Sequence, residues 1–168
     1  MSKAVLASVR PLYCYYYAIG RKTLELRKTC PKLDGPFKVY IYCTKEKPTF
    51  TQSAFCEGIS NGKVIGEFIC DCMTPLYNVC TDDWSLLRGG LHAIEKQLVG
   101  MACLTEEELH EYSNGKYCYA WHISDLKIYD KPKELSKFIS SKPKNKFRAH
   151  GDNLTRPPQS WCYVEELK

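Results

Sequence analysis

The sequence contains no long hydrophobic run and none of the short motifs that mark several common enzyme classes. No stretch approaches the roughly 20 consecutive apolar residues of a membrane-spanning helix, and residues 1–14 lack the long apolar centre of a signal peptide. Walker loops, Rossmann glycine patterns, HExxH and GxSxG are also missing, so nucleotide triphosphatase, dinucleotide, zincin and α/β-hydrolase chemistries have no support. We therefore expect a cytoplasmic protein that does not enter a membrane.

Paired metal-binding cysteines are lacking as well, although the chain has 10 cysteines. They are scattered through patterned segments rather than framing loops, which is typical of buried free thiols in a reducing compartment. The alternative is a zinc site at Cys70, Cys72 and Cys80, with Cys70 and Cys72 on the same face of a strand. Its spacing is not the paired CxxC of a zinc ribbon, so we predict no metal and no cofactor.

Positive charge is only in mild excess, with 24 Lys and Arg residues against 19 Asp and Glu residues. This balance permits binding to a polyanion without demanding it, because the clustering of the charges decides. Basic residues cluster at 21–28 and 142–148, and acidic residues gather at 106–111. The second basic cluster lies in residues 140–156, whose polar residues, proline and glycine predict a surface loop that would add nonspecific attraction for phosphate.

The length of 168 residues and the apolar content of 44% predict a single domain over residues 1–168. The expected strands are 3–9, 23–28, 37–44, 63–72, 117–130 and 160–167. The expected helices are 11–20, 82–103 with a split at two glycines, and 105–114, where Thr105 and Glu108 make a capping box. This order predicts an α+β fold built on a small, mostly antiparallel β-barrel with flanking helices.

The stretch GRKTLELRKTC, residues 20–30, combines alternation with concentrated charge. In a strand, its two leucines share one face, while Thr23, Glu25 and Arg27 are displayed on the other. The long side chain of Lys22 can reach the displayed face. One interpretation is a surface ion-pair ladder of little energetic value. The other is that Glu25 orients Arg27 or Lys22 toward an anion or base, or shares proton transfer with the lysine.

The pattern Gly20-x-Lys22-x-x-Glu25-x-Arg27 resembles the GxKxxExR motif of ASCH domains, a branch of the PUA-like superfamily. The lead-in SVRP at 8–11 and the segments WHISDLKIYDKPKEL and RPPQSWCYV resemble a phage and bacterial ASCH subgroup. The resemblance covers most of the chain. It implies a PUA-like β-barrel with helices packed beside it and a cleft lined by the motif.

Members of this family are thought to bind RNA or modified nucleotides, and a few have ribonuclease or acetylcytidine amidohydrolase activity. The working residues of the amidohydrolase branch are a lysine, a threonine and a glutamate. Lys22 matches the lysine, but Glu25 stands at the position of the threonine. The resemblance therefore does not carry amidohydrolysis over to this chain.

The expected site is a basic cleft in which cations hold phosphate or a base edge and an aromatic ring stacks on a base. Its candidate residues are Ser8, Arg10, Lys22, Glu25, Arg27, Trp121, His122, Arg156 and Trp161. Each tryptophan is either a stacking platform or a core residue. His122 alternates away from Trp121 and is either a general base or a structural residue.

These features favour a module that binds RNA or a modified nucleotide. The first alternative is an enzyme that cleaves RNA or hydrolyses a modified base, with Lys22 and Glu25 as the catalytic acid–base pair. The second is a phage-encoded protein-interaction inhibitor that uses the fold as a scaffold for a protein partner.

Overall fold

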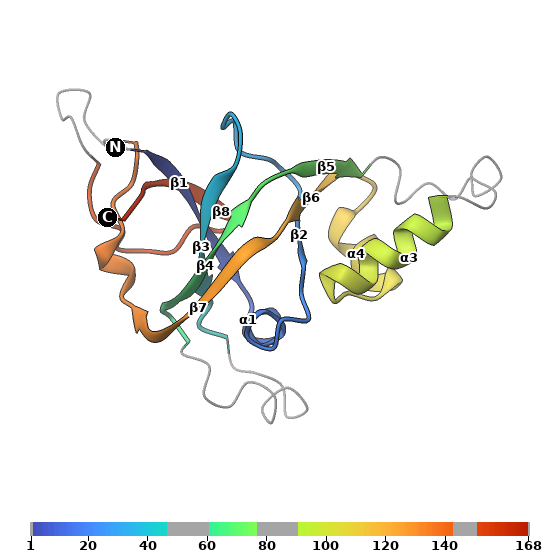
Figure 1. The fold of residues 1–168 in the computed structure, drawn as a ribbon, viewed down its shortest axis with the longest axis horizontal. Helices are drawn as coiled ribbons and strands as arrows, with labels where there is room; N and C mark the ends of the chain where they lie inside the picture. The colour runs from blue at the N-terminus through green and yellow to red at the C-terminus, as the bar shows by residue number, and fades with distance from the viewer. Residues whose placement is uncertain (1, 47–60, 77–90, 143–150, 168) are drawn as a thin grey trace.

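The computed structural model describes residues 2–46, 61–76, 91–142 and 151–167, which form an α+β fold of two sheets and three α-helices (Figure 1). The larger sheet has the order β7-β4-β3-β1-β8, with bounds Ser124–Lys133, Val64–Cys70, Phe37–Cys43, Lys3–Val9 and Trp161–Glu165. The smaller sheet has the order β2-β6-β5, with bounds Leu24–Arg27, Cys118–His122 and Met73–Leu76. The helices are α1 (Pro11–Ala18), α3 (Leu91–Ala102) and α4 (Glu106–Ser113), with a short 3-10 turn η1 at Leu135–Lys137.

The strand pairing is antiparallel except between β1 and β3. These two strands run parallel because α1 and β2 lie between them in the chain and provide the crossover that a parallel pair needs. The mixed α+β class and the predominantly antiparallel pairing are thus as expected. The ladders of the described strands leave two separate sheets and do not close a barrel.

Local sequence signals account for the ends of the helices. Pro11 occupies the first turn of α1, where its missing N–H costs nothing, and Gly20 follows the helix with a φ of 69° that glycine adopts without strain. Thr105 and Glu108 form the expected capping box of α4. Asn114 ends that helix in the left-handed region.

Three expectations about the elements need correction or restriction. Residues 117–130 do not form one strand, because the chain leaves β6 after His122 and β7 begins at Ser124 in the other sheet. Of the helix expected over 82–103, the described part is α3, and residues 82–90 lie outside the described residues. At the flanks of the expected loop 140–156, isolated antiparallel bridges pair Ser140 with Val164 and Ile139 with Asn153. Residues 143–150 lie outside the described residues.

The core has three parts, and two of them cover the two faces of β2. The first part, between the two sheets, includes Val5, Phe68 and Trp121. The second lies on the other face of the larger sheet. In the third, Leu24 and Leu26 pack against α3 and α4, which Figure 1 shows grouped beside the smaller sheet. The alternate residues of β2 therefore face the larger sheet.

None of the helices in the described part of the chain is long and apolar enough to cross a membrane. All eight cysteines that lie among the described residues are free thiols. Cys70 is buried, and Cys72 is exposed in the segment after the strand. The alternation stops because β4 ends at Cys70. Cys80 lies outside the described residues.

Candidate functional site

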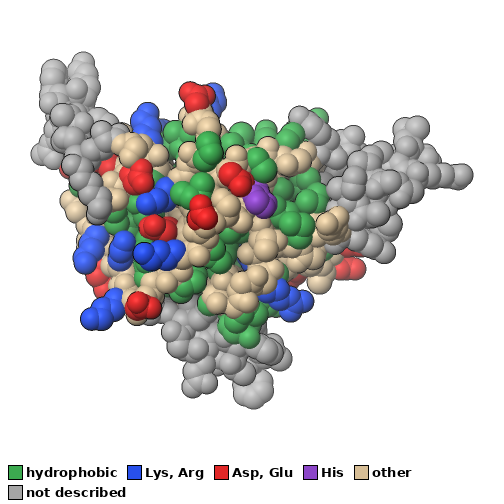
Figure 2. All heavy atoms as spheres, viewed as in Figure 1, with side chains coloured by type: hydrophobic (Ala, Val, Ile, Leu, Met, Phe, Trp, Pro, Cys, Tyr) green, Lys and Arg blue, Asp and Glu red, His purple; other side chains and the backbone are tan. Residues whose placement is uncertain are grey.

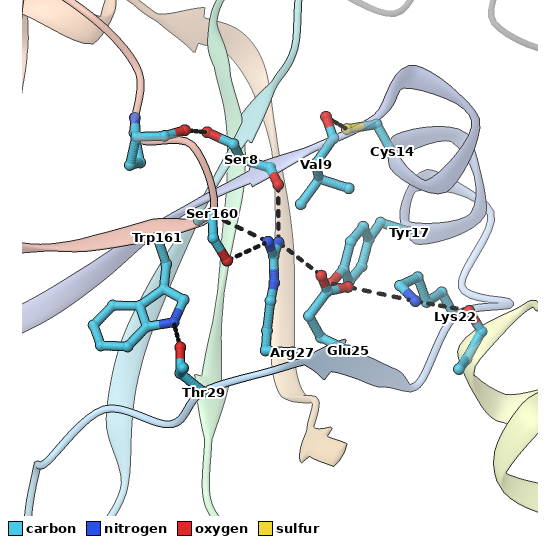
Figure 3. A network of polar contacts seen from close by, with 12 residues as sticks. Ser8, Val9, Cys14, Tyr17, Lys22, Glu25, Arg27, Thr29, Ser160 and Trp161 are labelled. Atoms are coloured by element: carbon cyan, nitrogen blue, oxygen red, sulfur yellow. Dashed lines mark hydrogen bonds and ion pairs between the residues drawn. The ribbon is translucent and has the colours of Figure 1, made fainter. Parts of the chain in front are cut away.

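A buried carboxylate is the centre of the motif. One oxygen of Glu25, Oε1, lies 2.7 Å from Nη2 of Arg27. The other, Oε2, accepts a hydrogen bond of 2.7 Å from the Tyr17 hydroxyl and lies 3.4 Å from Nζ of Lys22 (Figure 3). Both carboxylate oxygens are therefore occupied within the protein.

The three charged residues of the motif are not displayed on an exposed face. Lys22 is 3% exposed, and Glu25 and Arg27 are each 6% exposed. The expectation of a displayed polar face is wrong in this respect, and so is the alternative of a surface ion-pair ladder. The reason is that β2 is covered on one face by α3 and α4 and on the other by the larger sheet.

Arg27 joins three separate segments of the chain. Its Nη2 donates to the carbonyl of Ser8 at 2.9 Å, and its Nη1 donates to the carbonyl and hydroxyl of Ser160 at 3.2 and 3.3 Å. The Ser8 hydroxyl in turn donates to the carbonyl of Pro158 at 2.6 Å. The Nε of Arg27 is buried and has no hydrogen-bond partner among the described residues. A buried donor without a partner is uncommon and calls for an explanation.

Lys22 ends the network on the side of the helices. Its Nζ donates to the carbonyl of Ala102 at 2.7 Å, at the C-terminal end of α3, where the helix dipole favours a positive charge. The same nitrogen lies 5.1 Å from the ring centre of Tyr13 and 5.9 Å from that of Tyr17. These contacts add cation–π attraction in a place from which water is largely excluded.

Burial shifts the ionisation of this network. It lowers the pKa of Lys22, although the Glu25 charge offsets part of the shift. Burial acts to raise the pKa of Glu25, but Arg27, Lys22 and the Tyr17 hydrogen bond outweigh it and lower that pKa. Burial and the neighbouring carboxylate raise the pKa of Tyr17. Glu25 is therefore ionised at neutral pH and Tyr17 keeps its proton.

The two candidate tryptophans have different environments. Trp121 is fully buried, lies opposite Glu25 in the β2–β6 ladder, and has a buried Nε1 without a partner among the described residues. Trp161 is half-buried and donates from Nε1 to the Thr29 hydroxyl at 3.0 Å. The two rings meet edge to face with their centres 6.0 Å apart. Trp121 is thus a core residue, while part of Trp161 remains accessible.

The remaining candidates lie outside the network. Arg10 is exposed and lies 3.6 Å from Glu46. Arg156 is exposed in the segment before β8. His122 lies opposite Leu24, so it projects from the other face of the smaller sheet, away from Trp121 as the alternation predicts.

The structure thus brings four of the nine candidates, Ser8, Lys22, Glu25 and Arg27, into one polar network. Trp121 lies opposite Glu25 in the β2–β6 ladder, and Trp161 follows Ser160, which binds Arg27. The structure also adds Tyr17 and Ser160, which sequence reasoning did not assign to the site. The tyrosines of α1 were a visible signal, but their pattern suits core packing equally well. Ser160 joins Arg27 from 133 positions away in the chain, and no local pattern marks that contact.

No protein-family model matches the chain, and no curated protein sequence matches it. Among solved structures, the ASCH protein of Zymomonas mobilis is similar with a TM-score of 0.61 at 18% identity, over 97% of this chain and 88% of that one. Two single-substitution variants of that protein give TM-scores of 0.61 and 0.62 at 18% and 17% identity. These alignments cover 98% and 97% of this chain and 92% and 89% of the variants. At such low identity, the similarity establishes the fold.

Proposed function

Because the chain has the ASCH-domain fold, we propose that it binds RNA or a single modified nucleotide at the Arg27 end of the buried network. The observation that carries the proposal is the buried guanidinium of Arg27 beside the half-buried ring of Trp161, together with the Nε of Arg27, which has no hydrogen-bond partner in the described part of the chain. In this proposal the two sheets are the halves of a PUA-like barrel, and the protein acts in the cytoplasm.

The degree of burial determines from which side a ligand would arrive. The Lys22 end is closed by Tyr17, which is 1% exposed, and by Ala102, which is fully buried. The Arg27 end borders Ser160 and Trp161, both half-buried. A base or phosphate would therefore approach along the segment that leads into β8.

Each residue then has a definite task in binding. Trp161 would stack on the base, which contributes about 1–3 kcal/mol per base in proteins that bind single strands. Arg27 would donate from its Nε to a carbonyl of the base or to a phosphate oxygen, for which a planar guanidinium is suited. Glu25 would hold Arg27 in place, because both carboxylate oxygens are already engaged inside the protein.

A second candidate function is hydrolysis of RNA or of a modified base in the same place. The observation that favours it is the contact of 3.4 Å between Lys22 Nζ and the Glu25 carboxylate, together with the lowered pKa of the buried lysine. Lowering the pKa of a lysine brings its proton exchange closer to neutral pH. In that case Lys22 and Glu25 would be the acid–base pair.

The proposal is tested by titrating the protein at low salt with short single-stranded RNAs and with a panel of modified nucleosides. Binding is measured from the change in tryptophan fluorescence. We expect Trp161→Ala to weaken binding about 5- to 150-fold, the equivalent of one lost base stack. Trp161→Phe is the matched control, because it keeps a smaller stacking ring while losing the indole N–H that donates to Thr29. Arg27→Lys should weaken binding as well, because lysine cannot reproduce the planar donor.

Unchanged affinity in both Trp161→Ala and Arg27→Lys, with the fold intact by circular dichroism, would place the binding site elsewhere. Mass spectrometry of the same mixtures separates the two functions. A hydrolytic product that disappears in Lys22→Met would establish the enzyme, and bound ligand recovered without a product would establish the binding module.

A further inference from the structure

A second group of reactive side chains lies on the surface, on the other side of the smaller sheet from Trp121. Asp71, Cys72 and His122 each offer one ligand atom, and these atoms all lie within 4.8 Å of one another. Asp71 and Cys72 are exposed and His122 is half-exposed. On the face drawn in Figure 2, a histidine side chain lies beside an acidic one.

The fold holds these residues in place through the backbone. Asp71 and Cys72 form the two-residue connection from β4 to β5, and His122 is the last residue of β6. The backbone N–H of His122 donates to the carbonyl of Cys72 at 3.0 Å. The Cys70 thiol donates to the same carbonyl at 3.3 Å. The neighbouring residues Met73 and Trp121 pair in the β5–β6 ladder, so the group lies at the ends of paired strands.

We propose that Asp71, Cys72 and His122 form a binding site for a zinc ion. A thiolate, an imidazole and a carboxylate are the three kinds of ligand that zinc accepts in proteins. Calcium and magnesium prefer sets made of oxygen alone, so the cysteine argues against them. Three protein ligands leave the fourth tetrahedral position to a water molecule, the arrangement that zinc enzymes use for chemistry.

The present geometry is close to what a metal requires. His122 Nδ1 and Asp71 Oδ1 are hydrogen-bonded at 2.6 Å. Ligand atoms in a tetrahedral site with bonds of about 2.0 Å lie roughly 3.3 Å apart, so these two atoms need to separate by less than about 1 Å when the ion replaces the proton between them. The partial exposure of all three side chains permits this movement.

The proposed zinc site is distinct from the proposed nucleotide site. Its histidine projects from the face of β6 opposite to Trp121, and none of its three ligands contacts the Glu25 network in the described structure. The site also differs from the cysteine set that the sequence suggested. Cys70 is buried and does not join it, and its thiol pKa is raised to about 12, chiefly by burial.

Titration of metal-free protein with Co²⁺ tests the site directly, because a thiolate bound to cobalt produces an intense charge-transfer absorption. We expect one ion per chain and displacement of the cobalt by Zn²⁺. Competition with a coloured chelator then gives the zinc affinity. Cys72→Ser, His122→Gln and Asp71→Asn should each weaken zinc binding at least tenfold, while Cys30→Ser, a control at another partly exposed thiol, should leave it unchanged.

Thermal unfolding gives a second readout that does not depend on the absorption band. Zinc should raise the Tm of the wild-type protein and of Cys30→Ser but not that of Cys72→Ser or His122→Gln. The substituted side chains are partly exposed, so the variants should fold normally without the metal. Zinc affinity that survives Cys72→Ser or His122→Gln would overturn the assignment, as would a wild-type protein that takes up no cobalt.

Discussion

Replacing Glu25 by glutamine removes the charge that neutralises two buried cations. The glutamine side chain has nearly the same shape, so the core packing is preserved while Lys22 and Arg27 are left without their carboxylate. Breaking a buried ion pair from one side costs about 3–5 kcal/mol, because an uncompensated charge remains. With a urea m-value of about 2 kcal/mol/M, the unfolding midpoint should fall by about 1.5–2.5 M.

The pH dependence of this variant adds a second test. In Glu25→Gln the pKa of Lys22 should fall further, because the carboxylate that opposes the effect of burial is gone. A lysine whose folded pKa is lowered binds fewer protons in the folded than in the unfolded protein. Stability should therefore rise as the pH increases from the folded pKa toward the unfolded value of about 10.4.

On the acid side the stability of the wild-type protein also rises with pH. The folded pKa of Glu25 is lowered, so its contribution to stability is complete above the unfolded value of about 4.3 and is lost as the pH falls through the folded value. Glu25→Gln should lack this component of acid unfolding.

The matched control is Glu134→Gln, the same chemical change in the exposed pair with Lys63 at 2.8 Å. It should leave the urea midpoint unchanged within error, because exposed ion pairs contribute little. If Glu25→Gln also shifted the midpoint by less than about 0.5 M, or if its stability did not rise at alkaline pH, the description of a buried and mutually dependent network would be refuted.

Two smaller changes test the surroundings of the network and the helices beside it. Tyr17→Phe removes the hydrogen bond to the buried Glu25 carboxylate. We expect the free energy of unfolding in urea to fall by about 1–3 kcal/mol and the acid-unfolding midpoint to move to higher pH. An unchanged acid midpoint would contradict this hydrogen bond. Thr105→Ala should lower the stability by about 1 kcal/mol in thermal unfolding, because the helix cap is lost. Thr105→Ser should retain most of the wild-type stability, since serine also caps helices. Equal stability of the two variants would argue against the capping box.

Local patterns were enough to identify several elements. The β-branched and small residues of 3–9 correspond to β1 in its full length. The Thr105 and Glu108 pair correctly marked the start of α4, because a capping box depends on residues three positions apart. The alternation of residues 23–28 also separated the two leucines from Glu25 and Arg27. In each case the residues that produce the pattern are only a few positions apart in the sequence.

The candidate site depended on contacts that no local pattern contains. Alternation assigns Glu25 and Arg27 to one face of β2 but does not say what covers that face, and the larger sheet turned an expected surface ladder into a buried network. His122 meets Asp71 across 51 positions of the chain, and their meeting created a metal-ligand set that the spacing of the cysteines did not suggest. Side-chain direction follows from the backbone repeat of a strand, whereas burial and the choice of partners follow from how distant elements pack against one another.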